Sequence, residues 1–143
     1  MRFLGVDLGR RRVGLAISDP SGTLARPLST LVVRTSDDAL DQVAAIVARL
    51  AAEDDGLATI VIGVPRSLDG TPTGATAEAT AFIEALAART SLPVAGEDER
   101  LSSHEADSRL AVGERDWRKR KERLDAAAAA VILQDYLDRR HSG

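Results

Sequence analysis

Thr59-Ile60-Val61-Ile62-Gly63-Val64 is the stretch of sequence that decides the fold. It is a continuous apolar run, which is typical of a strand buried on both faces of a parallel sheet. A Pro- and Gly-rich loop follows it, from Pro65 to Gly74. Helical periodicity is present on both sides of this unit, in the apolar positions Leu40, Val43, Val47 and Leu50 before it and Ala79, Phe82 and Leu86 after it. The stretch therefore predicts a strand–helix crossover unit of an α/β domain.

The residues before this unit predict three strands. Residues 2–8, residues 13–18 and part of 23–33 have strand-like patterns, and short links join them. Asp19-Pro20-Ser21-Gly22 is a strong turn signal, because Pro fixes φ and Gly tolerates positive φ. We expect these strands to form an antiparallel meander. A helix then begins near residue 36, capped by Thr35 or Ser36.

The residues after the unit predict further helices and a fifth strand. A second helix is expected over 75–89, and a strand that begins at Leu92 ends in Glu97-Asp98-Glu99. Ser102 and Glu105 have the spacing of a capping box, which predicts a third helix. We expect the basic stretch 113–123 to be a loop, and a final helix to cover 124–138.

The predicted fold is α/β. The element order β-β-β-α-β-α-β-α-α gives a mixed five-stranded sheet, with three antiparallel strands, then two parallel ones, and helices on both faces. The chain has 143 residues, which suits a single domain over 1–143.

Composition narrows the class of protein. Hydrophobic residues make up 44% and charged residues 29%, which is ordinary for a soluble globular protein. The absence of cysteine excludes a disulfide framework and a Cys-based zinc site. The N-terminus lacks the apolar length of a signal peptide, and no 18-residue apolar stretch exists. We therefore expect a cytoplasmic protein without membrane contact.

Basic residues gather in two clusters, although the net charge is −3. Arg10, Arg11 and Arg12 form the first cluster. The second consists of Arg115, Arg118, Lys119, Arg120, Lys121 and Arg123, and the only Trp, Trp117, lies within it. Such clusters on an acidic chain indicate a local phosphate-binding surface, with a solvated loop as the alternative for the second cluster. Trp117 would stack on an unpaired base or fold back on its own domain.

Acidic residues lie at the predicted carboxyl ends of strands, where α/β proteins place their sites. Asp7 lies inside an apolar strand, where burying a lone charge is costly, and a metal ion or a turn cap would explain it. Asp125 begins the last helix, on the face expected to pack on the sheet, and could equally be a simple N-terminal acid. Together with an acid from Glu97-Asp98-Glu99, they are suitable oxygen ligands for Mg²⁺ or Mn²⁺.

Four segments carry a resemblance to a known family. They are 5–9 with 12–19, 61–65 with 68–71, 98–103, and 124–125 with 127–128 and 132–137. The four segments occur in this order and span nearly the whole chain. With them, the sequence resembles the YqgF/RuvX family of pre-16S rRNA nucleases, also called Holliday junction resolvase-like proteins. The resemblance implies an RNase H-like fold.

The resemblance also implies that Asp7, Glu99 and Asp125 are the catalytic and metal-binding acids, and it selects Glu99 over Glu97. Glu97 is itself a departure from the family pattern, and three roles stay open for it: a ligand, repulsion of substrate, or a solvent-facing side chain. Ser67 also departs from the Asn or polar amide often found after Pro65.

The expected function is a two-metal nuclease that uses Mg²⁺ or Mn²⁺ and processes the 5′ end of pre-16S rRNA in ribosome biogenesis. The alternatives are a Holliday junction resolvase, a non-catalytic module that binds RNA or the ribosome, and an actin-like ATPase or sugar kinase. The last class needs two lobes around a nucleotide, and a chain of 143 residues has room for only one of them. We expect the partner to be nucleic acid. Contact with the ribosome stays open, and so does the choice between a monomer and a homodimer. The residues expected to bind nucleic acid are Arg10, Arg11, Arg12, Arg66, Arg100, Trp117, Arg118, Lys119, Arg120 and Lys121.

Overall fold

The computed structural model describes residues 1–98 and 117–142, without the side chains of 117–124 and 142. Five strands and three helices occupy this part of the chain. They are β1 (Arg2–Leu8), β2 (Arg12–Ser18), β3 (Ala25–Val32), α1 (Ser36–Ala52), β4 (Leu57–Val64), α2 (Gly74–Ala87), β5 (Val94–Asp98) and α4 (Trp117–Ser142).

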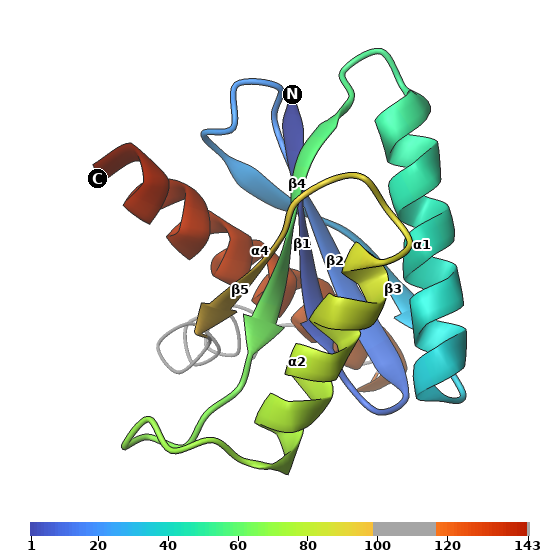
Figure 1. The fold of residues 1–143 in the computed structure, drawn as a ribbon, viewed down its shortest axis with the longest axis vertical. Helices are drawn as coiled ribbons and strands as arrows, with labels where there is room; N and C mark the ends of the chain where they lie inside the picture. The colour runs from blue at the N-terminus through green and yellow to red at the C-terminus, as the bar shows by residue number, and fades with distance from the viewer. Residues whose placement is uncertain (99–116, 143) are drawn as a thin grey trace.

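The strands form one mixed sheet in the order β3-β2-β1-β4-β5. β1 pairs antiparallel with β2, and β2 antiparallel with β3. β4 pairs parallel with β1, and β5 parallel with β4. Figure 1 shows α1 and α2 on one face of the sheet and α4 across the other. The prediction of a mixed five-stranded sheet covered on both faces is confirmed.

Large aliphatic side chains fill the face under α1 and α2. The cluster includes Leu4, Leu15, Ile60, Ile62 and Leu86, all of them fully buried. The helix α1 contributes the positions that its periodicity predicted, because Val43, Val47 and Leu50 are buried. This face is therefore a conventional hydrophobic core, in which the sheet packs against two helices.

The other face packs much more closely on its helix. Two glycines make this possible: a Cβ placed on Gly5 would lie 2.8 Å from Cβ of Leu133, and one on Gly14 would lie 2.0 Å from the carbonyl oxygen of Asp125. Both distances are shorter than real Cβ contacts, so the α4 backbone rests directly on β1 and β2. The smaller cluster of Phe3, Ala16, Val61, Ala129, Ile132, Leu133 and Leu137 surrounds these two contacts.

The direction of α4 is fixed at its far half by the β2–β3 turn. Nε2 of Gln134 donates to the carbonyl oxygen of Thr23 at 2.9 Å, and the backbone N–H of Ala25 donates to Oε1 of Gln134 at 2.9 Å. His141 contacts the carbonyl oxygen of Gly22 through Nε2 at 2.9 Å. The helix is thus held at two places, Gly14 near its start and this turn near its end.

The loop expected over 113–123 is wrong for residues 117–123. α4 begins at Trp117, seven residues before the predicted start at Leu124, and continues to Ser142. The physical reason is that Arg, Lys and Glu are good helix formers, so a basic run continues a helix as easily as it forms a loop. Residues 113–116 and the third helix predicted at Ser102 and Glu105 lie outside the described residues.

We predict that Gly14→Ala destabilises the protein by about 1–3 kcal/mol, because the added methyl group displaces the start of α4 from the sheet. Gly74→Ala is the matched control. A Cβ at Gly74, in the first turn of α2, meets no atom within 4 Å, and Ala is the better helix former. Urea unfolding of the two variants and the wild type measures both effects. Equal stability of the two variants would contradict the close contact.

Candidate active site

The carboxyl ends of β1, β4 and β5 lie at one edge of the sheet. Figure 1 shows this edge at the bottom of the view, with the β1–β2 turn and the first turns of α1 and α2. The loop over residues 65–73 leaves β4 at the same edge. We refer to this side of the molecule as the carboxyl edge. Asp7 and the first basic cluster, Arg10 to Arg12, lie on the elements that form it.

The structure brings Asp7 and Asp125 to the same face of this edge. Asp7 is the antiparallel partner of Gly14, and paired residues direct their side chains to one face. The backbone of Asp125 lies directly against Gly14. Gly5, two residues before Asp7, contacts the same helix. The α4 face of the sheet therefore carries both carboxylates, one from a strand and one from a helix.

Both acids lie close to the core and are only partly accessible to solvent. Asp7 and Asp125 are each half-buried, and Oδ2 of Asp125 is inaccessible to solvent. Asp125 borders the buried stripe of α4, which is centred on Ala126, Ala129 and Leu133. Its backbone is part of the contact with Gly14, and the residue as a whole is only half-buried.

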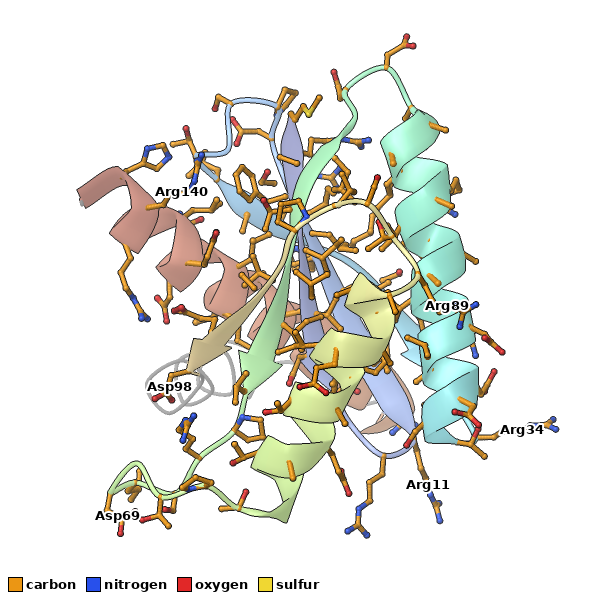
Figure 2. All side chains as sticks on the ribbon, in the orientation of Figure 1. Arg11, Arg34, Asp69, Arg89, Asp98 and Arg140 are labelled. Atoms are coloured by element: carbon orange, nitrogen blue, oxygen red, sulfur yellow. The ribbon has the colours of Figure 1, made fainter. Side chains whose placement is uncertain are left out.

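The first basic cluster forms the β1–β2 turn. A Cβ on Gly9 would lie 2.6 Å from the carbonyl oxygen of Arg12, so this turn has room for no side chain at that position. Arg10 and Arg11 are exposed, and Figure 2 shows Arg11 extending into solvent at the carboxyl edge. Arg12 lies on the same side of β2 as Gly14, since alternate strand residues share a face. Arg12 therefore lies on the face of the two acids, whereas Arg10 borders a cavity on the opposite face, between α1 and α2.

The third predicted acid and the side chains of much of the second basic cluster lie outside the residues that the structure describes. Glu99 and Arg100 lie outside the described residues, as do the side chains of Trp117, Arg118, Lys119, Arg120 and Lys121. Within residues 1–98 and 125–141, no three His, Asp or Glu side chains are grouped closely enough to hold a metal ion. The assignment of the acids and of the nucleic-acid contacts stays a prediction.

Glu97 lies inside the protein, so the interpretation of a solvent-facing side chain is wrong. Its side chain is 7% exposed and forms an ion pair with Arg139 of α4. Burial raises the pKa of Glu97, the charge of Arg139 opposes that rise, and the nearby Asp135 adds to it. Glu97 pairs with Gly63 of β4 and faces the helix that carries Asp125. It connects the end of β5 to the far half of α4.

A cavity of about 700 Å³ opens at the carboxyl edge on the opposite face of the sheet, between α1 and α2. Aliphatic side chains such as Val33 and Leu40 line it, and Arg10 and Arg34 lie at its border. Arg34 precedes the cap of α1 and points into solvent in Figure 2. No sequence pattern marks Arg34, because an isolated arginine before a helix cap has no recognisable spacing.

The loop 65–73 is held in shape by its own hydrogen bonds. The hydroxyl of Ser67 donates to Oδ1 of Asp69 at 2.6 Å, and the backbone N–H of Thr71 donates to the same oxygen at 2.9 Å. These bonds lower the pKa of Asp69 to about 2. The serine that departs from the family pattern is therefore part of the internal structure of the loop.

None of the helices in the described residues has the length and hydrophobicity needed to cross a membrane.

Comparison with known proteins agrees with the fold and with the expected family. A solved structure of RuvC from Thermus thermophilus superposes with a TM-score of 0.52 at 15% identity, covering 99% of this chain and 97% of that one. RuvC in complex with a Holliday junction substrate gives the same TM-score at 18% identity, covering 99% and 96%. At these identities the likeness shows the RNase H-like fold alone.

Sequence relatives are closer. A protein of Anaeromyxobacter sp. (strain Fw109-5) named "Putative pre-16S rRNA nuclease" is 44% identical over 99% of this chain and 100% of its own length. A protein of the same name from Chloroflexus aggregans is 39% identical over 98% of this chain and 95% of its own length. The family model described as "RuvX: Holliday junction resolvase" matches residues 1–139. The chain belongs to the RuvX family.

Proposed function

We propose that this protein is a metal-dependent nuclease that hydrolyses phosphodiester bonds in processing the 5′ end of pre-16S rRNA. The names of its full-length relatives support the substrate. The observation that carries the proposal is the contact between Asp125 and Gly14, the partner of Asp7. That contact places two carboxylates on one face, at the edge where α/β folds bind their ligands.

The residues at this site fit divalent cations of the Mg²⁺ class. Carboxylate oxygens are the ligands that Mg²⁺ and Mn²⁺ prefer, and the solvent-inaccessible Oδ2 of Asp125 belongs to such a donor. We propose that Asp7, Glu99 and Asp125 would hold the ions of a two-metal site. When bound, such ions supply an acidified water and stabilise charge on the leaving 3′ oxygen of a phosphodiester.

The side chains around the acids hold and orient the substrate in this proposal. Arg10 and Arg11 are exposed on the β1–β2 turn, at the same end of the sheet as the acids, and bind flanking phosphates. Arg66 contributes from the loop after β4. Positive groups on these two loops align the scissile phosphate, and this alignment lowers the entropic part of the barrier. Affinity that comes from phosphate contacts falls steeply with salt.

A second candidate is the resolution of four-way DNA junctions, which the description of the family model favours. This role needs two active sites presented to two strands, and a symmetric dimer supplies them. The two candidates differ in substrate and share the same acids. Cleavage of a substrate panel therefore separates them.

We predict that Asp7→Asn abolishes cleavage and leaves RNA binding and unfolding temperature within the range of the wild type. The amide keeps the shape of the carboxylate but loses the charge that holds the cations. The assay compares cleavage of single-stranded RNA, a precursor-type rRNA 5′ leader, single-stranded DNA and a four-way junction, with Mg²⁺, Mn²⁺ or EDTA.

Asp54→Asn is the control for this experiment, because Asp54 is an exposed acid in the turn after α1, far along the chain from the site residues. It should cleave like the wild type. Metal-dependent cleavage of the leader supports rRNA processing, and symmetric cuts in the junction alone support the resolvase. Full activity of Asp7→Asn would refute the assignment of the site, and binding without cleavage by the wild type would favour a non-catalytic module.

We also predict that Arg11→Ala reduces the salt dependence of RNA binding. Removing one phosphate contact lowers the slope of log affinity against log salt by about 1. Arg49→Ala is the matched control, since Arg49 is equally exposed but lies in the last turn of α1, at the opposite edge. Fluorescence anisotropy over a range of KCl concentrations measures both slopes. Equal slopes for the two variants would show that the β1–β2 turn makes no phosphate contact.

A further inference from the structure

Leu68 is the most exposed large apolar side chain of the described residues. It is 85% exposed, compared with 66% for Leu24 and for Val32. Leu68 lies in the turn Ser67 to Gly70, which is closed by a hydrogen bond of 2.9 Å from the N–H of Gly70 to the carbonyl oxygen of Ser67. Turns of this kind favour polar residues and proline. An exposed leucine here therefore calls for an explanation.

The loop around Leu68 presents this side chain in a fixed position. The N–H of Ser67 donates to the carbonyl oxygen of Thr71 at 3.1 Å, and Arg66 forms an isolated antiparallel bridge with Pro72. Gly70 has φ of +88°, which lets the chain turn back. Asp69, with its pKa of about 2, stays ionised and keeps its two hydrogen bonds at any physiological pH. The turn is thus ordered before it meets any partner.

The position of the loop identifies the side of the molecule that its partner approaches. β4 runs parallel to β1, so the loop that follows β4 starts at the same edge as Asp7. Figure 2 shows Asp69 on this loop, which projects beyond the carboxyl edge, and Asp98 at the end of β5 on the same side of the view. A molecule bound at Asp7 and Asp125 can therefore extend along the loop.

The proposed site at this edge and the nearby Arg66 favour a nucleic acid over a protein as this partner, although the ionised Asp69 directly follows Leu68. Arg66 precedes the turn by two residues, and its guanidinium donates to the carbonyl oxygen of Gly70 at 3.3 Å, which keeps it beside Leu68. Arg10 and Arg11 lie on the other exposed turn of the same edge. An apolar side chain beside an arginine matches a nucleic acid, in which each base step lies next to a phosphate. Apolar wedges of this kind open base steps in known complexes.

We propose that Leu68 inserts between two bases of the nucleic-acid substrate and so positions the phosphodiester beside Asp7 and Asp125. This inference rests on the proposed nuclease function and adds a specificity-determining residue to it. The insertion buries the leucine and unstacks one step. The preformed turn lowers the ordering cost of this contact. Arg66 binds the phosphate next to the opened step.

The test uses substrates in which 2-aminopurine, whose fluorescence rises on unstacking, replaces one base at a time around the cleavage site. Binding is measured in EDTA, so that cleavage does not interfere, and cleavage is measured separately with Mg²⁺ or Mn²⁺. The variants are Leu68→Ala and Leu68→Phe. The matched control is Leu24→Ala, which removes the same side chain from an exposed position in the β2–β3 turn.

We expect the wild type and Leu24→Ala to raise the fluorescence at one or two adjacent positions. Leu68→Ala should lose most of this rise and bind about tenfold more weakly, and Leu68→Phe should retain both properties. Unfolding temperatures of all variants should agree, because Leu68 has almost no contact with the core.

Two results overturn the inference in distinguishable ways. If the wild type binds and cleaves, and Leu68→Ala matches Leu24→Ala in affinity and in fluorescence, the wedge is refuted and the nuclease function stands. Leu68 would then belong to a protein contact. If the wild type neither binds nor cleaves any substrate of the panel, the proposed function fails, and the wedge fails with it.

Discussion

The direct contact of α4 with the sheet at Gly5 and Gly14 is the constraint on which the rest of the structure depends. A Cβ at either position would lie closer to α4 than real Cβ contacts allow, so the helix would have to move away from the sheet. With glycine, the helix backbone reaches β1 and β2, and the Asp125 end of α4 lies over the partner of Asp7. A packing requirement and a requirement of the site are thus met by the same residue, Gly14.

The two faces of the sheet differ in how they pack against their helices. Under α1 and α2, large aliphatic side chains form the core that stabilises the fold. Under α4, a smaller cluster that includes Phe3, Ile132, Leu133 and Leu137 packs around two glycines, which permit a short distance between helix and strand. The α4 face therefore combines apolar packing with the two candidate acids at its edge. Gln134 adds hydrogen bonds between α4 and the β2–β3 turn.

Local patterns predicted the parts of the fold that depend on burial. The continuous apolar run of β4 indicated a parallel strand, and the periodicity of α1 identified its buried residues. The start of α4 differs from the predicted one because Arg, Lys and Glu favour helices, so a basic run does not by itself indicate a loop. The approach of Asp125 to Asp7 could not be derived from local patterns, since it depends on a strand register and a helix crossing between residues more than 100 positions apart. The sequence marked both acids as candidate ligands, and the family resemblance implied that they act together.

Glu97 shows why acid residues at a strand end cannot be sorted by spacing alone. It lies on the same face as the candidate acids, yet Arg139 neutralises it inside the protein. A buried carboxylate with a cationic partner adds little negative potential to its surroundings, whereas an acid that must attract a cation needs its charge left available. Glu97 therefore reinforces the junction of β5 with α4, two residues before the predicted ligand Glu99. At this strand end the described structure assigns Glu97 a structural contact, which its position in the sequence did not reveal.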